Sequence, residues 1–299
     1  MRIVSLLPSG TEIAFALGLG NELAGRTFEC DHPAAAEAVP VVSGTALPTD
    51  GSLSAAEIDA EVSARVAAGE SISTLDAEAI SAIDPEVILT QDLCRVCAVP
   101  SGMVTEALDA LGCAAEVVSL DPARLVDVVA DIGRIGQATG RENEAARLMA
   151  SLADRLGAVS AAVAGHPRRR VLLLEWGDPP FNAGHWMPDM VTTAGGEPVL
   201  APVGVRSHRL AWDEVGSEEV DVVVFAPCGF GTDAAAEQGR ALLDQPELAG
   251  VAEIWAVHAD GYFSRPGPRV VDGTELLAAV LHPDVVATAP DRALAVRLR

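Results

Sequence analysis

Two cysteines, Cys94 and Cys97, stand three positions apart in residues 91–97, whose sequence is QDLCRVC. The apolar run at 87–90 before them is typical of a buried strand, and Pro100 and Ser101 after them begin a helical pattern. Two thiols on such a loop can be metal ligands, a redox pair or ordinary packing residues. The helix begins after the second cysteine rather than at the first, which differs from the thioredoxin arrangement and favours metal binding over redox exchange.

The elements around this loop alternate between strands and helices. Apolar runs predict strands near residues 2–7, 39–42, 87–90, 116–120, 171–174, 220–225 and 254–257. We expect 142–163 to form one long amphipathic helix, 175–188 to form a loop, and the residues after Pro283 to be loosely attached. Alternation of this kind predicts parallel sheets with helices on both faces.

The two halves of the chain repeat one order of elements. The strand, loop, helix and glycine stop at 2–20 correspond to those at 171–196, and the strand before Cys94 corresponds to the strand before Cys228. A chain of 299 residues is long enough for two cores of about 150 residues each. We therefore predict an α/β protein of two similar lobes with mainly parallel sheets. The predicted parts are an N-terminal lobe at 1–140, a linking backbone helix at 141–165 and a C-terminal lobe at 166–299.

The loops after the strands predict where a ligand binds, because ligands of open parallel sheets lie beyond the carboxyl ends of the strands. Four of the five cysteines fall in these loops. Cys30, Cys94 and Cys97 are the predicted metal ligands, and three thiolates suit zinc, iron, an iron–sulfur cluster or cuprous copper. The predicted ligand-binding residues in the same set of loops are Glu29, Asp31, Trp176, His185, Trp186, Cys228 and Phe230.

Each of these residues also has a purely structural interpretation. Trp176, Trp186 and Phe230 can stack against a flat ligand or pack against other parts of the protein. His185, preceded by Gly184, can be a ligand or a structural histidine. Both alternatives stay open at this point.

Composition narrows the classes of partner. Forty-three acidic and 20 basic residues give a net charge of −23, which argues against binding nucleic acid. The chain contains no lysine, which excludes Schiff-base chemistry and a P-loop. No apolar run approaches the roughly 20 residues of a membrane span, so we expect no membrane insertion. The short apolar run at 3–7 does not fit an export signal, so we expect a cytoplasmic protein with reduced cysteines.

Several segments resemble the class III periplasmic binding proteins, the vitamin B12 and ferric-siderophore receptors of ABC importers. They are RIVSLLPSGTE at 2–12, DPEVILT at 84–90, the long linking helix, and the segment from Trp186 to Gly195 and Gly196. The resemblance spans nearly the whole chain and implies a rather rigid bilobed receptor with its ligand between the lobes. Typical receptors lack Cys30, Cys94 and Cys97, so the chain is more similar to a cytosolic, cysteine-bearing subgroup named cobalamin-binding.

These observations lead to one leading hypothesis and two alternatives. The leading hypothesis is a cytosolic bilobed protein that binds a metal, or a small metal-containing ligand such as cobalamin. The first alternative is a metalloenzyme on the same scaffold, in which Glu29, Asp31, Glu175 or His185 acts as the acid–base residue. The second is the substrate-binding protein of an ABC importer. The cysteines and the expected cytoplasmic location argue against an ABC transporter as a partner.

Overall fold

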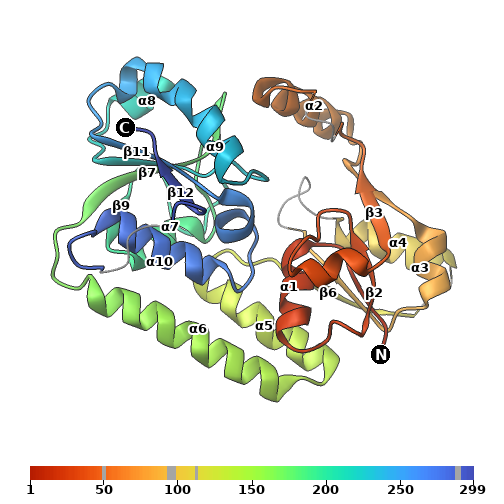
Figure 1. The fold of residues 1–299 in the computed structure, drawn as a ribbon. Coiled ribbons are helices and arrows are strands. Elements are labelled where there is room, and N and C mark those ends of the chain that lie inside the picture. The colour runs from red at the N-terminus through yellow and green to blue at the C-terminus, as the bar shows by residue number, and fades with distance from the viewer. Residues whose placement is uncertain (49–51, 93–98, 112–113, 287–290) are drawn as a thin grey trace. The chain divides into compact units, whose positions relative to one another are not determined.

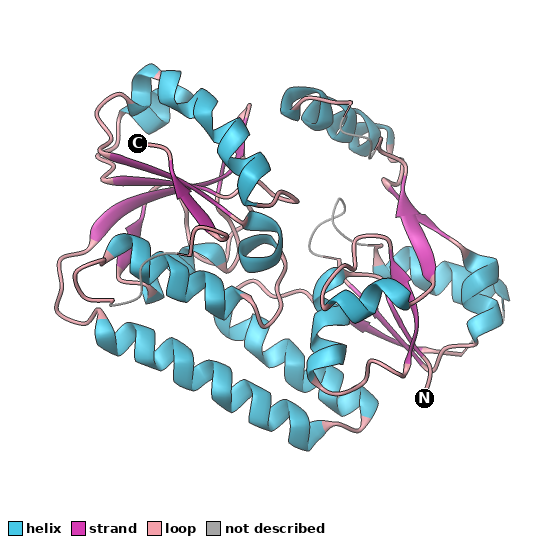
Figure 2. Cartoon of the chain, in the orientation of Figure 1, coloured by secondary structure: helices cyan, strands magenta, loops and turns pink. Residues whose placement is uncertain are grey.

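The structure is a computed structural model that describes residues 1–48, 52–92, 99–111, 114–286 and 291–299. They form two compact units, which Figures 1 and 2 show as ribbons. Unit 1 comprises Met1–Pro122 and Val129–Ala150, and unit 2 comprises Ala123–Val128 and Ser151–Arg299. Each unit is an α/β structure with its own sheet, as the sequence predicted.

Unit 1 is built on a sheet with the strand order β4-β3-β2-β1-β5-β6. Neighbouring strands are parallel except β3 and β4, which are antiparallel. The central strands β1 and β5 are buried at every position, because helices cover both faces of a parallel sheet. The strands are β1 (Ile3–Ser5), β2 (Leu23–Thr27), β3 (Val41–Thr45), β4 (Ser73–Leu75), β5 (Val87–Thr90) and β6 (Glu116–Ser119).

The helices of unit 1 include one that has little contact with the rest of the unit. Helix α2 begins with a capping box between Ser54 and Glu57 and ends at Gly69, whose φ of 71° is left-handed. None of its residues is buried, and Figure 1 shows it away from the sheet, beyond the end of β3. The helices are α1 (Pro8–Ala16), α2 (Ala55–Ala68), α3 (Ala77–Ile83), α4 (Ser101–Leu111) and a 3-10 turn at Ala34–Ala38.

Two further helices, α5 (Leu125–Thr139) and α6 (Glu142–Ala162), each contribute residues to both units. In unit 2, Arg155 of α6 donates hydrogen bonds to Asp272 and, over 2.9 Å, to Glu275. Both acceptors lie on α10 (Val270–Leu281), so these bonds attach the second half of α6 to that helix.

Unit 2 has a sheet with the order β12-β11-β10-β7-β8, and β9 pairs with β7. Strands β7, β10 and β11 are parallel, whereas β8 and β12 run antiparallel to their neighbours. Val222 to Phe225 in the middle of the sheet are at most 1% exposed. The strands are β7 (Arg169–Gly177), β8 (Pro180–Asn182), β9 (Gly196–Pro198), β10 (Val222–Phe225), β11 (Glu253–Val257) and β12 (Ala295–Arg297).

The remaining helical segments of unit 2 connect and cover these strands. Helices α7 and α10 pack against each other. A π-helical turn at Asp260–Ser264 follows β11 and lies against α10. The other segments are α7 (Met187–Thr193), α8 (Trp212–Gly216), α9 (Thr232–Gly239) and two 3-10 turns, Arg240–Asp244 and Pro246–Leu248.

Two expectations from the sequence were wrong. The tail after Pro283 is not loosely attached throughout, because β12 pairs with β11, and the Arg299 guanidinium donates to the Leu248 carbonyl over 2.7 Å. The expected loop at 175–188 contains strand structure, because β7 continues to Gly177 and β8 pairs back onto it.

Candidate functional site

The carboxyl end of the unit 2 sheet carries an aromatic pair. Trp176 lies near the end of β7, and Phe230 lies in the loop after β10. Their ring centroids are 6.0 Å apart at an angle of 46°, and both rings are partly exposed. The Trp176 indole N–H donates to the Asp178 carbonyl over 3.1 Å, which fixes the ring. Two neighbouring aromatic rings at the end of a sheet suit contact with a flat, largely apolar ligand.

Cys228 lies beside this pair. Its backbone N–H donates to the Glu175 carbonyl over 3.1 Å, so the loop after β10 is attached to the end of β7. The thiol is free and partly exposed. The structure thus brings Trp176, Cys228 and Phe230 together, and their predicted role in ligand binding stays a prediction.

His185 and Trp186 occupy the loop between β8 and α7. His185 has a φ of 55°, and its backbone N–H donates to the Val205 carbonyl over 2.7 Å. Gly184 is required here, because an added Cβ would lie 2.2 Å from the backbone nitrogen of Ser207. Trp186 is 4% exposed, and its indole N–H donates to the Phe263 carbonyl over 2.8 Å. Trp186 therefore connects this loop to the turn after β11 inside unit 2, and its predicted contact with a ligand stays a prediction.

The surroundings of His185 favour the neutral form of its imidazole. Burial lowers its pKa, and the charge of Arg206 lowers it further. Among the described residues, its Nε2 atom has no hydrogen-bond partner. A neutral imidazole with an unused nitrogen has the chemistry of a metal ligand or of a hydrogen-bonding group for a ligand.

The segment after β11 adds functional candidates that the sequence reasoning missed. The His258 and Tyr262 rings form a T-shaped pair with centroids 5.2 Å apart, and the Arg269 guanidinium lies over the Tyr262 ring, 5.2 Å from its centroid. Burial lowers the pKa of His258, the Asp260 carboxylate opposes this shift, and Arg269 supports it. Arg265 forms an ion pair with Asp260 at 2.7 Å. The sequence contained a signal for these residues, because β11 was predicted as a strand. Ligands of such sheets lie beyond the carboxyl ends of the strands, so the loop after β11 belongs with the loops after β7 and β10.

In unit 1, Cys30 follows β2 and is 1% exposed. Its Sγ atom lies 3.0 Å from the hydroxyl oxygen of Thr11, in the first half of α1. Glu29 is partly exposed and Asp31 is exposed. Cys94 and Cys97 lie outside the described residues, so the predicted three-thiol site stays a prediction. Among the residues that the structure describes, no group of three or more His, Cys, Asp and Glu side chains is arranged to hold a metal ion.

The carboxyl ends of β5 and β6 are joined by a network of acids and hydroxyls. Asp92 accepts hydrogen bonds from the backbone N–H and the hydroxyl of Ser101, over 2.8 and 2.5 Å, at the start of α4. Asp121 accepts from the Asp92 backbone N–H over 2.6 Å and from the Ser119 hydroxyl over 2.6 Å. This arrangement holds the start of α4 against both strands and gives unit 1 an acidic carboxyl end.

Residues 3–252 match the model of a family described as periplasmic binding protein. The chain belongs to this family. The match covers both units and confirms the resemblance seen in the sequence. No helix in the described parts of this binding protein is long and apolar enough to cross a membrane.

Curated relatives of this binding protein include the vitamin B12-binding proteins of Yersinia pestis (strain Pestoides F) and Yersinia pseudotuberculosis serotype O:1b (strain IP 31758). Each is 23% identical over 278 residues, which cover 90% of this chain and 82% of the relative.

Solved structures with the same fold include the periplasmic vitamin B12 binding protein of Vibrio cholerae, with a TM-score of 0.68 at 20% identity over 94% of this chain and 96% of that one. The periplasmic heme-binding protein of Roseiflexus sp. RS-1 has a TM-score of 0.69 at 21% identity over 95% and 98% of the two chains. An ABC transporter substrate-binding protein from Listeria monocytogenes EGD-e has a TM-score of 0.71 at 16% identity, over 94% of this chain and 98% of that one. These similarities confirm the predicted two-lobed α/β fold.

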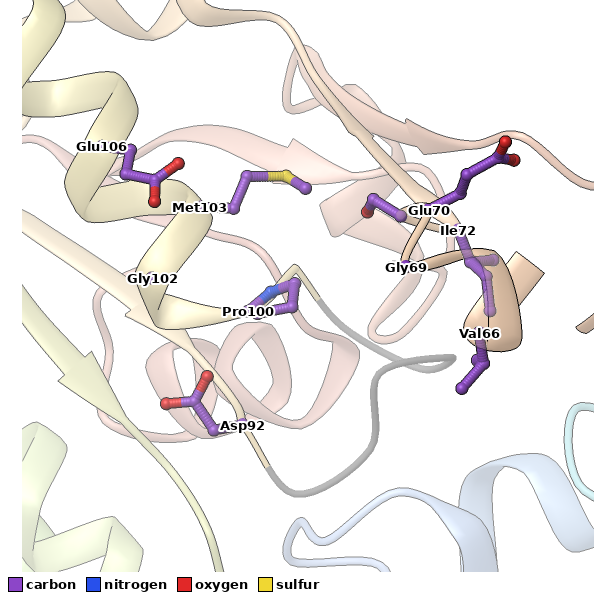
Figure 3. Close-up of a pocket in the computed structure, with 10 residues that line it drawn as sticks. Val66, Gly69, Glu70, Ile72, Asp92, Pro100, Gly102, Met103 and Glu106 are labelled. Carbon is purple, nitrogen blue, oxygen red and sulfur yellow. The ribbon is translucent and has the colours of Figure 1, made fainter. Parts of the chain in front are cut away.

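A pocket of about 610 Å³ lies in unit 1 of this binding protein, between the end of α2 and the start of α4. Figure 3 shows Met103 extending from α4 toward the segment that carries Glu70 and Ile72. Asp92 and Glu106 also line the pocket. Three carboxylates beside apolar side chains are unsuited to an anionic ligand.

Proposed function

We propose that this chain is a substrate-binding protein for a metal-containing macrocycle of the vitamin B12 or heme type. The aromatic pair of Trp176 and Phe230 at the carboxyl end of the unit 2 sheet is the observation that carries the proposal. Membership of the periplasmic binding protein family and the names of the relatives support it. The ligand rests on the aromatic pair, with Cys228 beside it, and its position between the two lobes stays a prediction from the resemblance.

The finer part of the proposal concerns the thiols of unit 1. Cys30, Cys94 and Cys97 act as ligands of a metal, either as an ion or cluster bound on its own or as the metal of the macrocycle. The partly exposed free thiol of Cys228 suits a reducing compartment, and we propose a cytoplasmic location on this basis. A cytoplasmic location would separate this chain from the importer role of exported relatives.

Absorption spectroscopy during titration of the purified full chain tests the macrocycle. The expected result is saturable binding of cobalamin or heme with a Kd of about 1 µM or lower, which corresponds to roughly 8 kcal/mol. Trp176→Ala should weaken binding. Trp255→Ala is the matched control, because Trp255 lies within β11 and its indole donates to Glu253. Failure of both macrocycles to bind would overturn the proposal.

Metal analysis tests the thiol site separately. Protein purified without oxygen should contain stoichiometric metal, and the Cys94→Ser/Cys97→Ser variant should lose it. Cys228→Ser, which leaves the three predicted ligands in place, should retain it. The thiol proposal is wrong if the unchanged protein holds no metal. Turnover of a small substrate by the metal-loaded protein would favour the metalloenzyme instead.

A further inference from the structure

Gln91 in unit 1 carries a buried amide without a hydrogen-bond partner. It follows β5 and is 4% exposed, and among the described residues its Nε2 atom has no acceptor. A buried polar group without a partner lowers stability, because it has lost its hydrogen bonds to water. Packing alone would favour an apolar side chain at this position, so the amide points to a role in binding.

The two neighbours of Gln91 in the chain face α4. The Thr90 hydroxyl donates to the Val99 carbonyl, just before α4. Asp92 accepts a hydrogen bond over 2.8 Å from the backbone N–H of Ser101, the first residue of α4. Side chains alternate between the two faces of an extended chain. Gln91, which stands between Thr90 and Asp92, therefore faces the opposite side of the sheet.

The opposite side of the sheet carries the start of α1. A Cβ added to Gly10 of α1 would lie 3.2 Å from the Cβ of Leu89, two positions before Gln91. The pairing of β1 with β5 continues to Leu6, whose N–H donates to the Leu89 carbonyl over 2.9 Å, and α1 begins two residues later at Pro8. The Gln91 amide therefore lies beside the first turn of α1.

The first turn of α1 holds two more N–H groups without acceptors. No side chain caps this end of the helix, and Thr11 is the first residue whose N–H bonds back, to the Leu7 carbonyl over 3.3 Å. Pro8 has no N–H, so the N–H groups of Ser9 and Gly10 lack an acceptor in the described part of the chain. Ser9 is 1% exposed. The helix start therefore adds two buried donors to the glutamine amide.

These three donors suit an uncharged oxygen. A helix start alone also suits an anion. A buried anion needs a counter-charge, however, and all three donors belong to uncharged amides. The net charge of −23 repels an anion, and Glu12 of α1 and Asp92 after Gln91 add to the negative charge at this end of the unit. An amide carbonyl is uncharged and can accept two hydrogen bonds.

We propose that the start of α1 and Gln91 bind an amide carbonyl of the ligand. This inference rests on the proposed function and narrows its ligand class, because rings of the vitamin B12 type carry amide side chains whereas heme carries carboxylates. The subsite lies at the carboxyl end of the unit 1 sheet, where open parallel sheets bind ligands. Asp92, next to Gln91, is exposed, so the subsite lies close to the surface of the unit. Gln91 determines specificity by donating to the carbonyl oxygen.

Two forms of one ring test the ligand with the full chain. Cobinamide carries amides where cobyrinic acid carries carboxylates. We expect cobinamide to bind at least about tenfold more tightly, which is in the range of one or two hydrogen bonds. Titration followed by absorption spectroscopy measures both dissociation constants.

A glutamine variant and a matched control test the residue. Gln91→Leu keeps the size of the side chain and removes its donor, so it should weaken cobinamide binding about tenfold and leave cobyrinic acid unchanged. Gln137→Leu is the control, because Gln137 is an exposed amide of the same unit, on α5. The melting temperature of ligand-free Gln91→Leu should be no lower than that of the unchanged protein, because a buried amide without a partner is removed. A purely structural glutamine would give a lower melting temperature.

Nuclear magnetic resonance of the unchanged protein tests the subsite without any substitution. Cobinamide with diamagnetic cobalt(III) should move the backbone N–H signals of Ser9 and Gly10 and the side-chain amide signal of Gln91 downfield, because new hydrogen bonds form. The side-chain amide signal of Gln137 should stay in place. Signals of Ser9, Gly10 and Gln91 that do not move at saturation would overturn the subsite.

Four other results overturn the amide subsite and leave the proposed function standing. The first is that cobyrinic acid binds as tightly as cobinamide, or more tightly. The second is that Gln91→Leu binds cobinamide with the affinity of the unchanged protein, and the third is a lowered melting temperature of ligand-free Gln91→Leu. The fourth is binding of heme without binding of either corrinoid. Absence of binding by all three ligands overturns the proposed function instead.

Discussion

The carboxyl ends of the two sheets have the same place in the fold and opposite chemistry. The unit 2 end presents the aromatic pair Trp176 and Phe230, whereas the unit 1 end carries the buried thiol of Cys30 and the acids Asp92 and Asp121. The strands that support these residues are similar, because both sheets are built from buried parallel runs. The difference arises in the loops, which determine what each sheet can bind. Under the proposed function, unit 2 supplies aromatic contacts to a flat ring, whereas the Asp92 network of unit 1 holds the start of α4 in place.

Breaking the ion pair that fixes the unit 2 turn should have the largest effect. Arg265→Met removes a cation from beside the largely buried Asp260 carboxylate, and we expect a loss of about 3 kcal/mol in the free energy of unfolding. Urea denaturation measures the loss, and hydrogen exchange should place it in unit 2. Arg147→Met, which breaks an exposed pair with Glu144, should cost about 1 kcal/mol or less. Equal losses in both variants would mean that the pair of Arg265 and Asp260 stabilises the protein no more than an exposed ion pair does.

Removing the aromatic surface should have the next largest effect. Trp176→Ala should weaken macrocycle binding by about 2 kcal/mol, roughly thirtyfold in Kd, because a central aromatic contact is lost. Calorimetric titration measures the change. If Trp255→Ala weakens binding equally, the ligand does not rest on the carboxyl end of this sheet.

Removing Asp92 tests whether the polar network of unit 1 holds α4 in place or contacts the ligand. Asp92→Ala deletes the acceptor at the start of α4, so we expect a loss of about 1 kcal/mol in stability. Macrocycle affinity should stay within about twofold of the unchanged protein, less than a hydrogen bond contributes. Asp76→Ala removes the cap of α3 and should cost a similar amount. A large affinity loss in Asp92→Ala alone would mean that the unit 1 network contacts the ligand.

The smallest effect concerns pH. The folded-state pKa values of His185 and His258 are lowered, so the unfolded chain binds protons more readily than the folded chain near pH 6. Stability should therefore be complete above the unfolded pKa of about 6.5 and should fall as the pH drops below it. Melting temperatures between pH 8 and 5 measure this slope, which His185→Asn/His258→Asn should reduce.

The central strands were predictable because their signal is local. Val87 to Thr90 and Val222 to Phe225 are continuous apolar runs, and only a strand buried on both faces explains such a short run between turns. Strands β8 and β12 were missed because they have three residues each and form by pairing with β7 and β11. No pattern within three residues contains that information.

The position of the unit 2 candidates was predictable for a related reason. Trp176, Cys228 and Phe230 lie at or after the ends of strands that the sequence indicated, so the topological rule placed them at one sheet end, and their contact with a ligand stays a prediction. Tyr262 was missed because it lies in a π-helical turn after β11. Periodicity does not indicate such a turn, and its single tyrosine matches no motif.

Strand β12 determines when unit 2 can be completed during synthesis. It covers the edge of β11, and Arg299 next to it donates to backbone carbonyls of Leu243 and Leu248. Until residues 295–299 have left the ribosome, β11 has an open edge that can pair with a strand of another chain. The sheet of unit 2 therefore stays incomplete until these residues have emerged, and a protease that removes them would expose the same edge.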